Sequence, residues 1–443
     1  MTRTTRVMPP APLVSERMIG EEDLPVARVD IELSSVPDEL ELINSTPGTR
    51  TALALIRLHS HPVGTVLLDV SESLSWQRHS AVVWASTCDA VNAHLAADGM
   101  PTVHGVESLR EPTGRPPECI RRRAELLADA PAITVVVATR ERPRSLRDCL
   151  EALLRMDYPN YRIVVVDNDP VTPATARLIA DHFRPAVGYV RENRRGLAAA
   201  HNRGLQEVDT AIVAFVDDDV LVDRHWLTGI AEGFAAAADV GCVSGLILPA
   251  ELETPAQLLL QRHGGYDKGF VRRIYDLNAH RPDDALFPFA AGRLGSGANM
   301  AFDTEILRRL GGFDRALGIG TFARGGDDLL AFFRVVLRHQ LVYQPAAIIW
   351  HRHHREMSAL RNQVSGYGVA LGAFMAAALA HEPRMWLGLL RRLPRGLAFA
   401  FSPTSSRNRT RYDGLPPDMA RREMAGLLYG PVTYIVSRWR TRD

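Results

Sequence analysis

Residues 133–155 read ITVVVATRERPRSLRDCLEALLR, and the expected fold class follows from this stretch. Its first part is a run of β-branched and apolar residues, which is typical of a strand covered on both faces of a parallel sheet. Its second part repeats leucine at helical spacing, and Ser145 and Asp148 stand as a capping box at its start. A buried strand followed directly by an amphipathic helix predicts one β-α unit of a parallel sheet.

Two further runs of the same kind occur at 163–166, which read IVVV, and at 212–216, which read IVAFV. Parallel strands need crossover connections, and the helix predicted after the first strand is one of them. We therefore expect an α/β fold with a Rossmann-like, mostly parallel central sheet flanked by helices.

The composition is typical of a folded chain. Of the 443 residues, 46% are apolar and 23% are charged, which excludes wholesale disorder and a polytopic membrane protein. Basic residues number 52 and acidic residues 51, so the net charge of +1 provides no field for capturing nucleic acid. The four cysteines show no CxxC spacing, which indicates reduced cytosolic thiols and disfavours a disulfide scaffold or a zinc ribbon.

The chain divides into parts that differ in composition and in predicted secondary structure. The first 45 residues are rich in Pro, Glu and Ser, and two strands at about 51–70, with a turn at 61–64, precede a helix at 76–98. The N-terminus lacks the apolar run of a signal peptide, so export is not expected. The four predicted parts are a mixed, β-rich accessory domain with a disordered start (1–110), a proline-rich linker (111–130), the α/β domain (131–360) and a helical C-terminal region (361–443).

The helical C-terminal region contains an uncharged stretch, 362–380, that approaches the ~20 residues needed to span a bilayer. Alanine and glycine dominate it, so a buried or interfacial helix is favoured over a span, with Gly366–Gly372 allowing another helix to approach closely. The segment 429–440 combines arginines with apolar side chains and predicts contact with a membrane surface. We expect a cytoplasmic protein at the inner face of the plasma membrane. The side chains predicted to make this contact are Tyr434, Ile435, Val436 and Trp439.

Acidic residues follow the predicted strands, where open parallel sheets bind their ligands. Asp167 follows the second strand, and Asp217-Asp218-Asp219 follows the third. At an extended strand end, Asp217 and Asp219 point to the same side, which suits a divalent cation shared with a diphosphate, while Asp218 faces away. Taken alone, the three aspartates are more simply interpreted as a solvated cap between a strand and a helix.

In their order and spacing, these motifs resemble family 2 of the glycosyltransferases, which are nucleotide-sugar-dependent enzymes with a GT-A fold. The resemblance covers roughly residues 131–368. Its pieces are VVVATRERPRSLRDCLEAL, YPNYRIVVVDNDP, ENRRGLAAAHNRGL, FVDDD, GANMAF, LGGFDRALG, GGDDLLAFFRV and WHRHHRE.

The resemblance implies a role for each matching position. The DxD motif of the family falls on Asp217 and Asp219, as metal ligands. Relatives commonly carry Arg immediately before the last Asn of the NxxGLAxAxN motif, and this chain has His201 there instead. The implied donor-binding residues are Thr139, Arg140, Glu141, Asp167, Asn193, Gly196, Asn202, Asp217 and Asp218.

A later acidic pair, Asp327-Asp328, stands where relatives usually have Glu-Asp. The resemblance implies that Asp328 is the catalytic base, with Asp327 as the alternative, although both also suit the start of a helix. Some relatives supply a histidine beyond the last strand as a third metal ligand. Here His351 is the first candidate, with His353 and His354 as competitors.

We therefore predict a metal-dependent inverting glycosyltransferase of glycan biosynthesis. Mg²⁺ or Mn²⁺ would bridge the diphosphate of a nucleotide-sugar donor, and a carboxylate would deprotonate the hydroxyl of a glycan, lipid-linked or small-molecule acceptor. Two alternatives remain open at this point. One is a nucleotidyltransferase, and the other is a non-catalytic module that binds a sugar nucleotide or a glycan.

Overall fold

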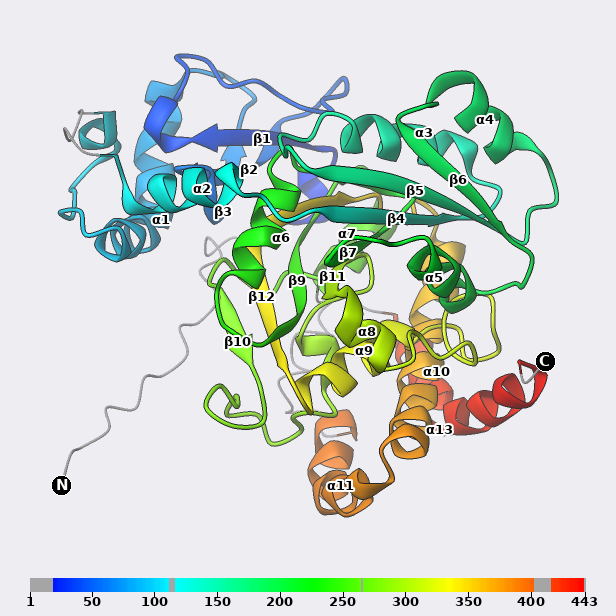
Figure 1. The fold of residues 1–443 in the computed structure, drawn as a ribbon. Coiled ribbons are helices and arrows are strands. Elements are labelled where there is room, and N and C mark those ends of the chain that lie inside the picture. The colour runs from blue at the N-terminus through cyan, green and yellow to red at the C-terminus, as the bar shows by residue number, and fades with distance from the viewer. Residues whose placement is uncertain (1–18, 111–115, 264–265, 402–415, 442–443) are drawn as a thin grey trace. The chain divides into compact units, whose positions relative to one another are not determined.

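The computed structural model describes residues 19–110, 116–263, 266–401 and 416–441. The chain forms two compact units (Figure 1). The first unit extends to Arg122 and includes the short segments 251–253 and 269–271, and the second comprises the rest of the chain.

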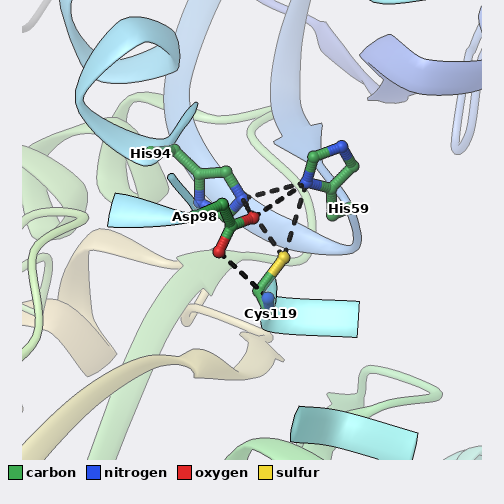
Figure 2. Close-up of side chains that lie close together, drawn as sticks. All are labelled: His59, His94, Asp98 and Cys119. Atoms are coloured by element: carbon green, nitrogen blue, oxygen red, sulfur yellow. Dashed lines mark hydrogen bonds and ion pairs between the residues drawn. The ribbon is translucent and has the colours of Figure 1, made fainter. Parts of the chain in front are cut away.

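The described part of the first unit is built on a three-stranded sheet with the order β1-β2-β3. Its elements are η1 (Glu21–Asp23), β1 (Val26–Glu32), η2 (Leu33–Ser35), β2 (Thr51–Leu58), β3 (His61–Asp69), α1 (Trp76–Ala97) and η3 (Val106–Arg110). β1 and β2 are parallel, β2 and β3 are antiparallel, and α1 packs an apolar stripe against the sheet. At the end of α1, His94 and Asp98 lie beside His59 and Cys119 (Figure 2).

Three expectations for this region need correction. β1 lies inside the stretch 1–45 that the composition predicts to be loosely ordered, of which residues 1–18 lie outside the described part. The turn between β2 and β3 is His59-Ser60 rather than 61–64, and both turn residues have positive φ, 54° and 65°. Helix α2 (Glu118–Ala128) occupies most of the predicted linker, because its prolines stand just before the helix, where they are tolerated.

The second unit contains, within the described residues, a nine-stranded sheet with the order β10-β12-β9-β11-β7-β4-β5-β6 and with β8 paired to β12. β4, β5, β6, β7, β9 and β12 share one direction, so the sheet is mostly parallel. Its strands are β4 (Ile133–Thr139), β5 (Tyr161–Asn168), β6 (Val187–Glu192), β7 (Ile212–Asp217), β8 (Val220–Val222), β9 (Val240–Pro249), β10 (Arg273–Tyr275), β11 (Asn299–Asp303) and β12 (Gln340–His351).

Helices cover both faces of this sheet, as the alternation along each strand requires. Val135 and Val137 face α3, α4 and α6, whereas Val136 and Ala138 face α5, α8 and α9. The helices and short turns are α3 (Pro143–Leu153), α4 (Ala174–His182), α5 (Leu197–Gln206), α6 (Trp226–Phe234), α7 (Pro255–His263), η4 (Ala291–Arg293), α8 (Thr304–Arg309) and α9 (Asp327–Val336). The predicted α/β fold class is confirmed. The capping box at Ser145 is not formed, because Pro143 begins α3 and Arg142 is its N-cap.

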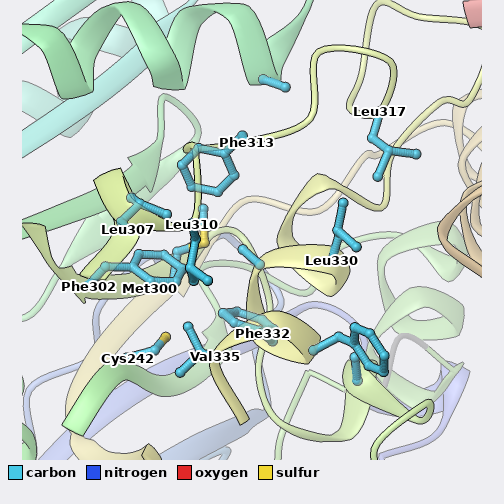
Figure 3. Close-up of a cluster of buried hydrophobic side chains, with 14 of the residues drawn as sticks. Cys242, Met300, Phe302, Leu307, Leu310, Phe313, Leu317, Leu330, Phe332 and Val335 are labelled. Atoms are coloured by element: carbon cyan, nitrogen blue, oxygen red, sulfur yellow. The ribbon is translucent and has the colours of Figure 1, made fainter. Parts of the chain in front are cut away.

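The larger core lies on the face covered by α5 and α9 (Figure 3). Phe302 of β11 stacks on Phe332 of α9 with ring centroids 6.3 Å apart, and Phe313 meets Phe302 edge-on at 5.9 Å. All three rings are buried, and truncating a buried phenylalanine to alanine typically costs about 3–5 kcal/mol. This packing fixes α9, whose first two residues are the predicted acidic pair Asp327 and Asp328.

The C-terminal region is helical, as predicted. Its elements are α10 (Met357–His381), η5 (Pro383–Met385), α11 (Trp386–Phe401) and α13 (Pro417–Arg440). α10 and α13 pack at glycines: a Cβ atom on Gly368 would lie 1.9 Å from the carbonyl oxygen of Glu423, and one on Gly430 would lie 2.5 Å from that of Val369. The close approach predicted for the glycine-rich segment is therefore confirmed.

By length and composition, α10 alone among the described helices could cross a membrane, and half of its most apolar window is buried.

One residue of the predicted membrane-contacting set lies elsewhere. Tyr434 is buried and donates a hydrogen bond of 2.8 Å to Asp314 Oδ2, so it belongs to the core. Ile435, Val436 and Trp439 are exposed, as predicted. The composition of the segment did not indicate which face of the helix packs inward, and contact of the exposed side chains with a membrane stays a prediction.

Candidate active site

The carboxyl ends of β4, β5 and β7 form one edge of the large sheet. β5 and β6 lie on one side of β4, and the chain then crosses to place β7 on the other side, so the strand order reverses between β4 and β7. Register places Thr139 opposite Asp167, and Ala138 opposite Asp217. Open α/β sheets bind ligands in the crevice at such a reversal, and this edge carries the predicted acidic residues.

Asp217, Asp219 and His351 converge at this edge, with one ligand atom from each within 4.8 Å of the others. β8 pairs with the end of β12 and sets Val220 opposite His351, which brings the imidazole Nε2 to 3.4 Å from Asp219 Oδ1. Asp219 Oδ1 is buried and has no hydrogen-bond partner among the described residues. Two carboxylates and an imidazole with an unsatisfied buried oxygen fit a divalent cation.

His351 is oriented by residues that the sequence did not single out as its partners. Its Nδ1 lies 2.9 Å from Nδ1 of His353, whose Nε2 lies 3.0 Å from Gln261 Oε1. The ring of Tyr266 stacks on both imidazoles, with centroids 5.6 and 5.5 Å away. Neighbours of this kind fix the ring plane of a metal-binding histidine. His353 therefore faces His351, and His354 is exposed.

The charges of this cluster are unbalanced. Burial, followed by the charges of the neighbouring aspartates, raises the pKa of Asp217 well above its usual value. Asp327 is one of those neighbours, so the two acidic segments interact electrostatically. Burial lowers the pKa of His351, which keeps the imidazole neutral and able to bind a metal. A bound cation would offset the electrostatic repulsion between these carboxylates.

Arg142 is a site residue that the sequence analysis missed. Its guanidinium donates hydrogen bonds of 2.7 Å to Asp218 Oδ1 and 3.0 Å to Asp219 Oδ2. The hydroxyl of Thr139 donates to the other oxygen of Asp218 at 2.6 Å. Both oxygens of Asp218 are therefore used within the protein, and its contact with a donor stays a prediction. The available signal was the position of Arg142, two residues after Arg140 in the loop that follows β4.

The predicted donor-binding residues Arg140 and Glu141 organise the loops of this edge. Arg140 donates a 3.0 Å hydrogen bond to Asp169 Oδ2, and both side chains are partly exposed. Glu141 accepts a 2.6 Å hydrogen bond from the hydroxyl of Thr172, which is the main cause of its lowered pKa, and further hydrogen bonds from the backbone N–H groups of Thr172 and Val171, both at 2.9 Å. Glu141 thus fixes the loop after β5.

Asp167 is fully buried and accepts a 2.9 Å hydrogen bond from the hydroxyl of Tyr189. Burial raises its pKa. The next residue, Asn168, donates to the carbonyl of Arg194 at 2.8 Å and accepts from the N–H of Gly196 at 2.9 Å. Gly196 has φ of 133° at the N-cap of α5, which explains why a glycine is needed there. The contact of Asp167 and Gly196 with a nucleotide stays a prediction.

The two remaining predicted donor residues differ in their surroundings. Asn193 is exposed in the loop before α5. Asn202 exchanges two hydrogen bonds with the backbone of Phe313, donating at 2.7 Å and accepting at 2.8 Å. Its side-chain amide therefore closes the loop after α8, and the structure does not bring it to the carboxylate cluster.

Asp327 and Asp328 begin α9, where the helix dipole favours negative charge. Asp328 accepts hydrogen bonds of 2.8 Å from the backbone N–H groups of Gly297 and Leu329. Burial and the charge of Asp327 nevertheless raise the pKa of Asp328 to about 6. Such a carboxyl group is poised to accept a proton near neutral pH.

His201 lies beside Asp327. Its Nδ1 lies 3.5 Å from Asp327 Oδ2, and the ring is buried between Phe215 and Phe313, each with its centroid 4.9 Å away. The sequence shows His201 as a departure from the family pattern. The structure adds that this residue lies next to the acidic pair.

A mostly parallel sheet with paired aspartates beyond its point of reversal agrees with the GT-A arrangement that the resemblance implies. Residues 134–287 match the model of the family described as Glycosyl transferase family 2. This match, over about a third of the chain, agrees with the resemblance seen in the sequence. The matched part includes Asp217–Asp219 and ends before Asp327.

Curated relatives carry names of the same kind. The pre-mycofactocin glycosyltransferase of Mycobacterium tuberculosis is 24% identical over 227 residues, which are 51% of this chain and 43% of the relative. The succinoglycan biosynthesis protein ExoM of Rhizobium meliloti is 28% identical over 190 residues, or 40% of this chain and 60% of the relative. This chain spans less than half the length of the first relative.

Solved structures of glycosyltransferases also align with the chain. A mannosyltransferase from Pyrobaculum calidifontis, in complex with GDP-Man and Mn²⁺, aligns with a TM-score of 0.43 and 18% identity, over 73% of this chain and 94% of that one.

Proposed function

We propose that this protein is a metal-dependent inverting glycosyltransferase, which moves a sugar from a nucleotide-diphosphate donor to an acceptor hydroxyl. The observation that carries the proposal is the convergence of Asp217, Asp219 and His351 at the reversal point of the sheet, within electrostatic reach of Asp327. The match of residues 134–287 to the model of Glycosyl transferase family 2 and the names of the curated relatives support the same chemistry.

On the donor side, Asp217, Asp219 and His351 would hold Mg²⁺ or Mn²⁺. When bound, the cation stabilises the negative charge of the departing diphosphate. Arg142 already bridges Asp218 and Asp219 at the rim of this cluster, and its side chain is 45% exposed, so it can also face a phosphate. His353 and Tyr266 keep the imidazole of His351 in place.

On the acceptor side, Asp328 would remove the proton of the incoming hydroxyl. Its two backbone hydrogen bonds fix the carboxylate, and its pKa of about 6 leaves it deprotonated at neutral pH but still basic. Asp327 and His201 would position Asp328 and adjust its pKa through charge. One direct attack of the acceptor oxygen on the anomeric carbon breaks the bond to the diphosphate and inverts the configuration at that carbon.

Product analysis tests the proposal and its nearest rival together. The full chain is incubated with Mn²⁺, a panel of nucleotide sugars and mixed glycan or lipid-linked acceptors, and the products are separated by chromatography. Glycosyl transfer releases a nucleoside diphosphate, whereas nucleotidyl transfer releases pyrophosphate. The Asp328→Asn variant should retain donor binding but lose the release of the diphosphate.

Two results would overturn the proposal. Release of pyrophosphate would establish a nucleotidyltransferase. Tight donor binding with no turnover for any acceptor would favour a non-catalytic binding module instead.

Contact with an anionic membrane is proposed as a second property of the chain. Along α13, the exposed apolar side chains include Leu428, Val432, Ile435 and Trp439, at 69, 60, 66 and 71% exposure, which follow one another at helical spacing. Arginines lie on the same helix, and this combination favours binding to a surface of negatively charged lipids. This property fits a lipid-linked acceptor at the inner face of the plasma membrane.

A further inference from the structure

The first unit contains a cluster of metal-binding side chains that the proposed reaction does not use. His59, His94, Asp98 and Cys119 each offer one ligand atom, and these four atoms lie within 4.8 Å of one another (Figure 2). His59 comes from the β2–β3 turn, His94 and Asp98 come from the end of α1, and Cys119 comes from the start of α2. All four belong to the first compact unit.

The distances between these four ligand atoms are close to those expected around a single metal ion. His59 Nδ1 and His94 Nε2 are 3.1 Å apart, and Cys119 Sγ lies 3.4 and 3.5 Å from them. Asp98 Oδ2 lies 3.5 Å from the first nitrogen and 3.4 Å from the second. Ligand atoms around a tetrahedral zinc ion, at ~2.0–2.3 Å from the metal, lie ~3.3–3.7 Å from one another. Four of the five distances fall within this range, and the fifth, 3.1 Å between the two nitrogens, is slightly shorter.

Hydrogen bonding alone does not account for this convergence. Burial lowers the pKa of both imidazoles, that of His94 to about 4, so each ring is neutral at pH 7 and keeps a lone pair. Asp98 Oδ1 accepts a 3.0 Å hydrogen bond from the N–H of Cys119 and caps α2. Asp98 Oδ2 is buried and has no hydrogen-bond partner among the described residues. Nitrogen, oxygen and sulfur atoms thus gather at one place, and Asp98 Oδ2 remains without a hydrogen bond there.

The surrounding backbone supports the same arrangement. His59 and Ser60 both adopt positive φ, a conformation that Asn-Gly turns adopt more readily, and this turn orients the His59 ring. Glu32 of β1 stabilises the turn by accepting from the N–H groups of His59 at 3.0 Å and Ser60 at 2.7 Å. On α1, His94 and Asp98 are four residues apart and therefore share one face of the helix end.

We propose that His59, His94, Asp98 and Cys119 bind one zinc ion that stabilises the first unit. The mixture of thiolate, imidazole and carboxylate ligands favours zinc over Mg²⁺ or Ca²⁺, which select oxygen. Four protein ligands leave no open position, so the ion is structural rather than catalytic. It links the start of α2 to the end of α1 and to the β2–β3 turn. A search for paired cysteines does not find this site, because it contains a single cysteine.

Cobalt substitution of the full chain tests the proposal, because a thiolate ligand gives Co²⁺ a charge-transfer absorption that oxygen ligands do not give. The metal-free chain is titrated with Co²⁺, and one equivalent should produce this absorption together with the strong visible bands of a tetrahedral ion. Zinc should then displace the cobalt and abolish both signals. Asp219→Asn, which impairs the other cation cluster, should leave the signals unchanged.

Cysteine variants assign the ligand. Cys119→Ala should lose the charge-transfer band and at least ten-fold in zinc affinity, whereas Cys88→Ala, on α1 outside the cluster, should retain both. Cys149 and Cys242 are fully buried and do not compete for the metal in the folded chain. EDTA should lower the melting temperature of the wild type by about 5 °C or more and should not lower that of Cys119→Ala further.

If Cys119→Ala does not fold, the wild-type titration still decides, because absence of the charge-transfer band overturns the proposal. A band that survives in folded Cys119→Ala, or that disappears in Cys88→Ala, would also refute it.

Discussion

Lowering the pH from 7 to 5 should reduce kcat for sugar transfer about ten-fold, because the proposed base becomes protonated. Burial and the charge of Asp327 raise the pKa of Asp328 to about 6, although two backbone hydrogen bonds oppose this rise. A carboxyl group with that pKa is ~90% deprotonated at pH 7 and ~10% deprotonated at pH 5. Since a general base acts in its deprotonated form, the rate should rise through pH 6 and level off above pH 7.

Variants of the acidic pair make this prediction specific. Asp327→Asn removes a neighbouring negative charge, which lowers the pKa of Asp328 and moves the rise in rate to lower pH. Asp328→Asn should remove the rise near pH 6 and lower kcat by about 10²–10⁴-fold, the usual contribution of a general base. If Asp327 were the base, Asp327→Asn would instead cause the large loss.

The assay must distinguish protonation of Asp328 from protonation of the metal ligands, which would release the metal. Release of the nucleoside diphosphate is measured directly by chromatography, at saturating donor, acceptor and Mn²⁺, at each pH. Circular dichroism at each pH controls for unfolding. A rate that does not change between pH 5 and 8, or an unchanged pH profile in Asp327→Asn, would refute the assignment of Asp328 as the base.

The remaining predictions concern packing, membrane binding and metal affinity. Gly368→Ala should lower the free energy of unfolding by at least ~2 kcal/mol in urea denaturation, because the new Cβ collides with α13, whereas Gly366→Ala, with no neighbour closer than 4.0 Å, should not. The double variant Ile435→Ser and Trp439→Ser should float less with vesicles of phosphatidylglycerol than the wild type, and equal flotation would refute the membrane contact. His353→Ala should raise the Mn²⁺ concentration for half-maximal activity ~10–100-fold while kcat at saturating Mn²⁺ stays near that of the wild type, and an unchanged concentration would contradict its positioning role.

The sheet could be predicted because its strands are dense in β-branched residues. The runs at 133–138, 163–166 and 212–216 correspond to β4, β5 and β7. Strands buried on both faces consist almost entirely of apolar residues, so their sequences are easy to recognise. β1 was missed because it carries charged residues within the sequence VARVDIE and lies next to a proline-rich stretch. Helix α2 was missed because the prolines before it suggested a linker.

The acidic residues of the site could be predicted, whereas their partners could not. Strand ends fix where Asp217 and Asp219 lie, and the parallel register then brings them to the edge that also carries Asp167. The contacts of Arg142 and Tyr266 depend on loop conformations that no periodicity encodes. The same holds for Tyr434, because the inward face of α13 is set by its partner helix, which the composition of α13 alone does not specify.

The most direct test of the account is calorimetric titration of nucleoside diphosphates into the full chain, with and without Mn²⁺, for the wild type and Asp219→Asn. The account predicts that Mn²⁺ tightens binding of the preferred diphosphate at least ten-fold in the wild type and has little effect in the variant. Equal enhancement by Mn²⁺ in both proteins would contradict a cation site built on Asp219.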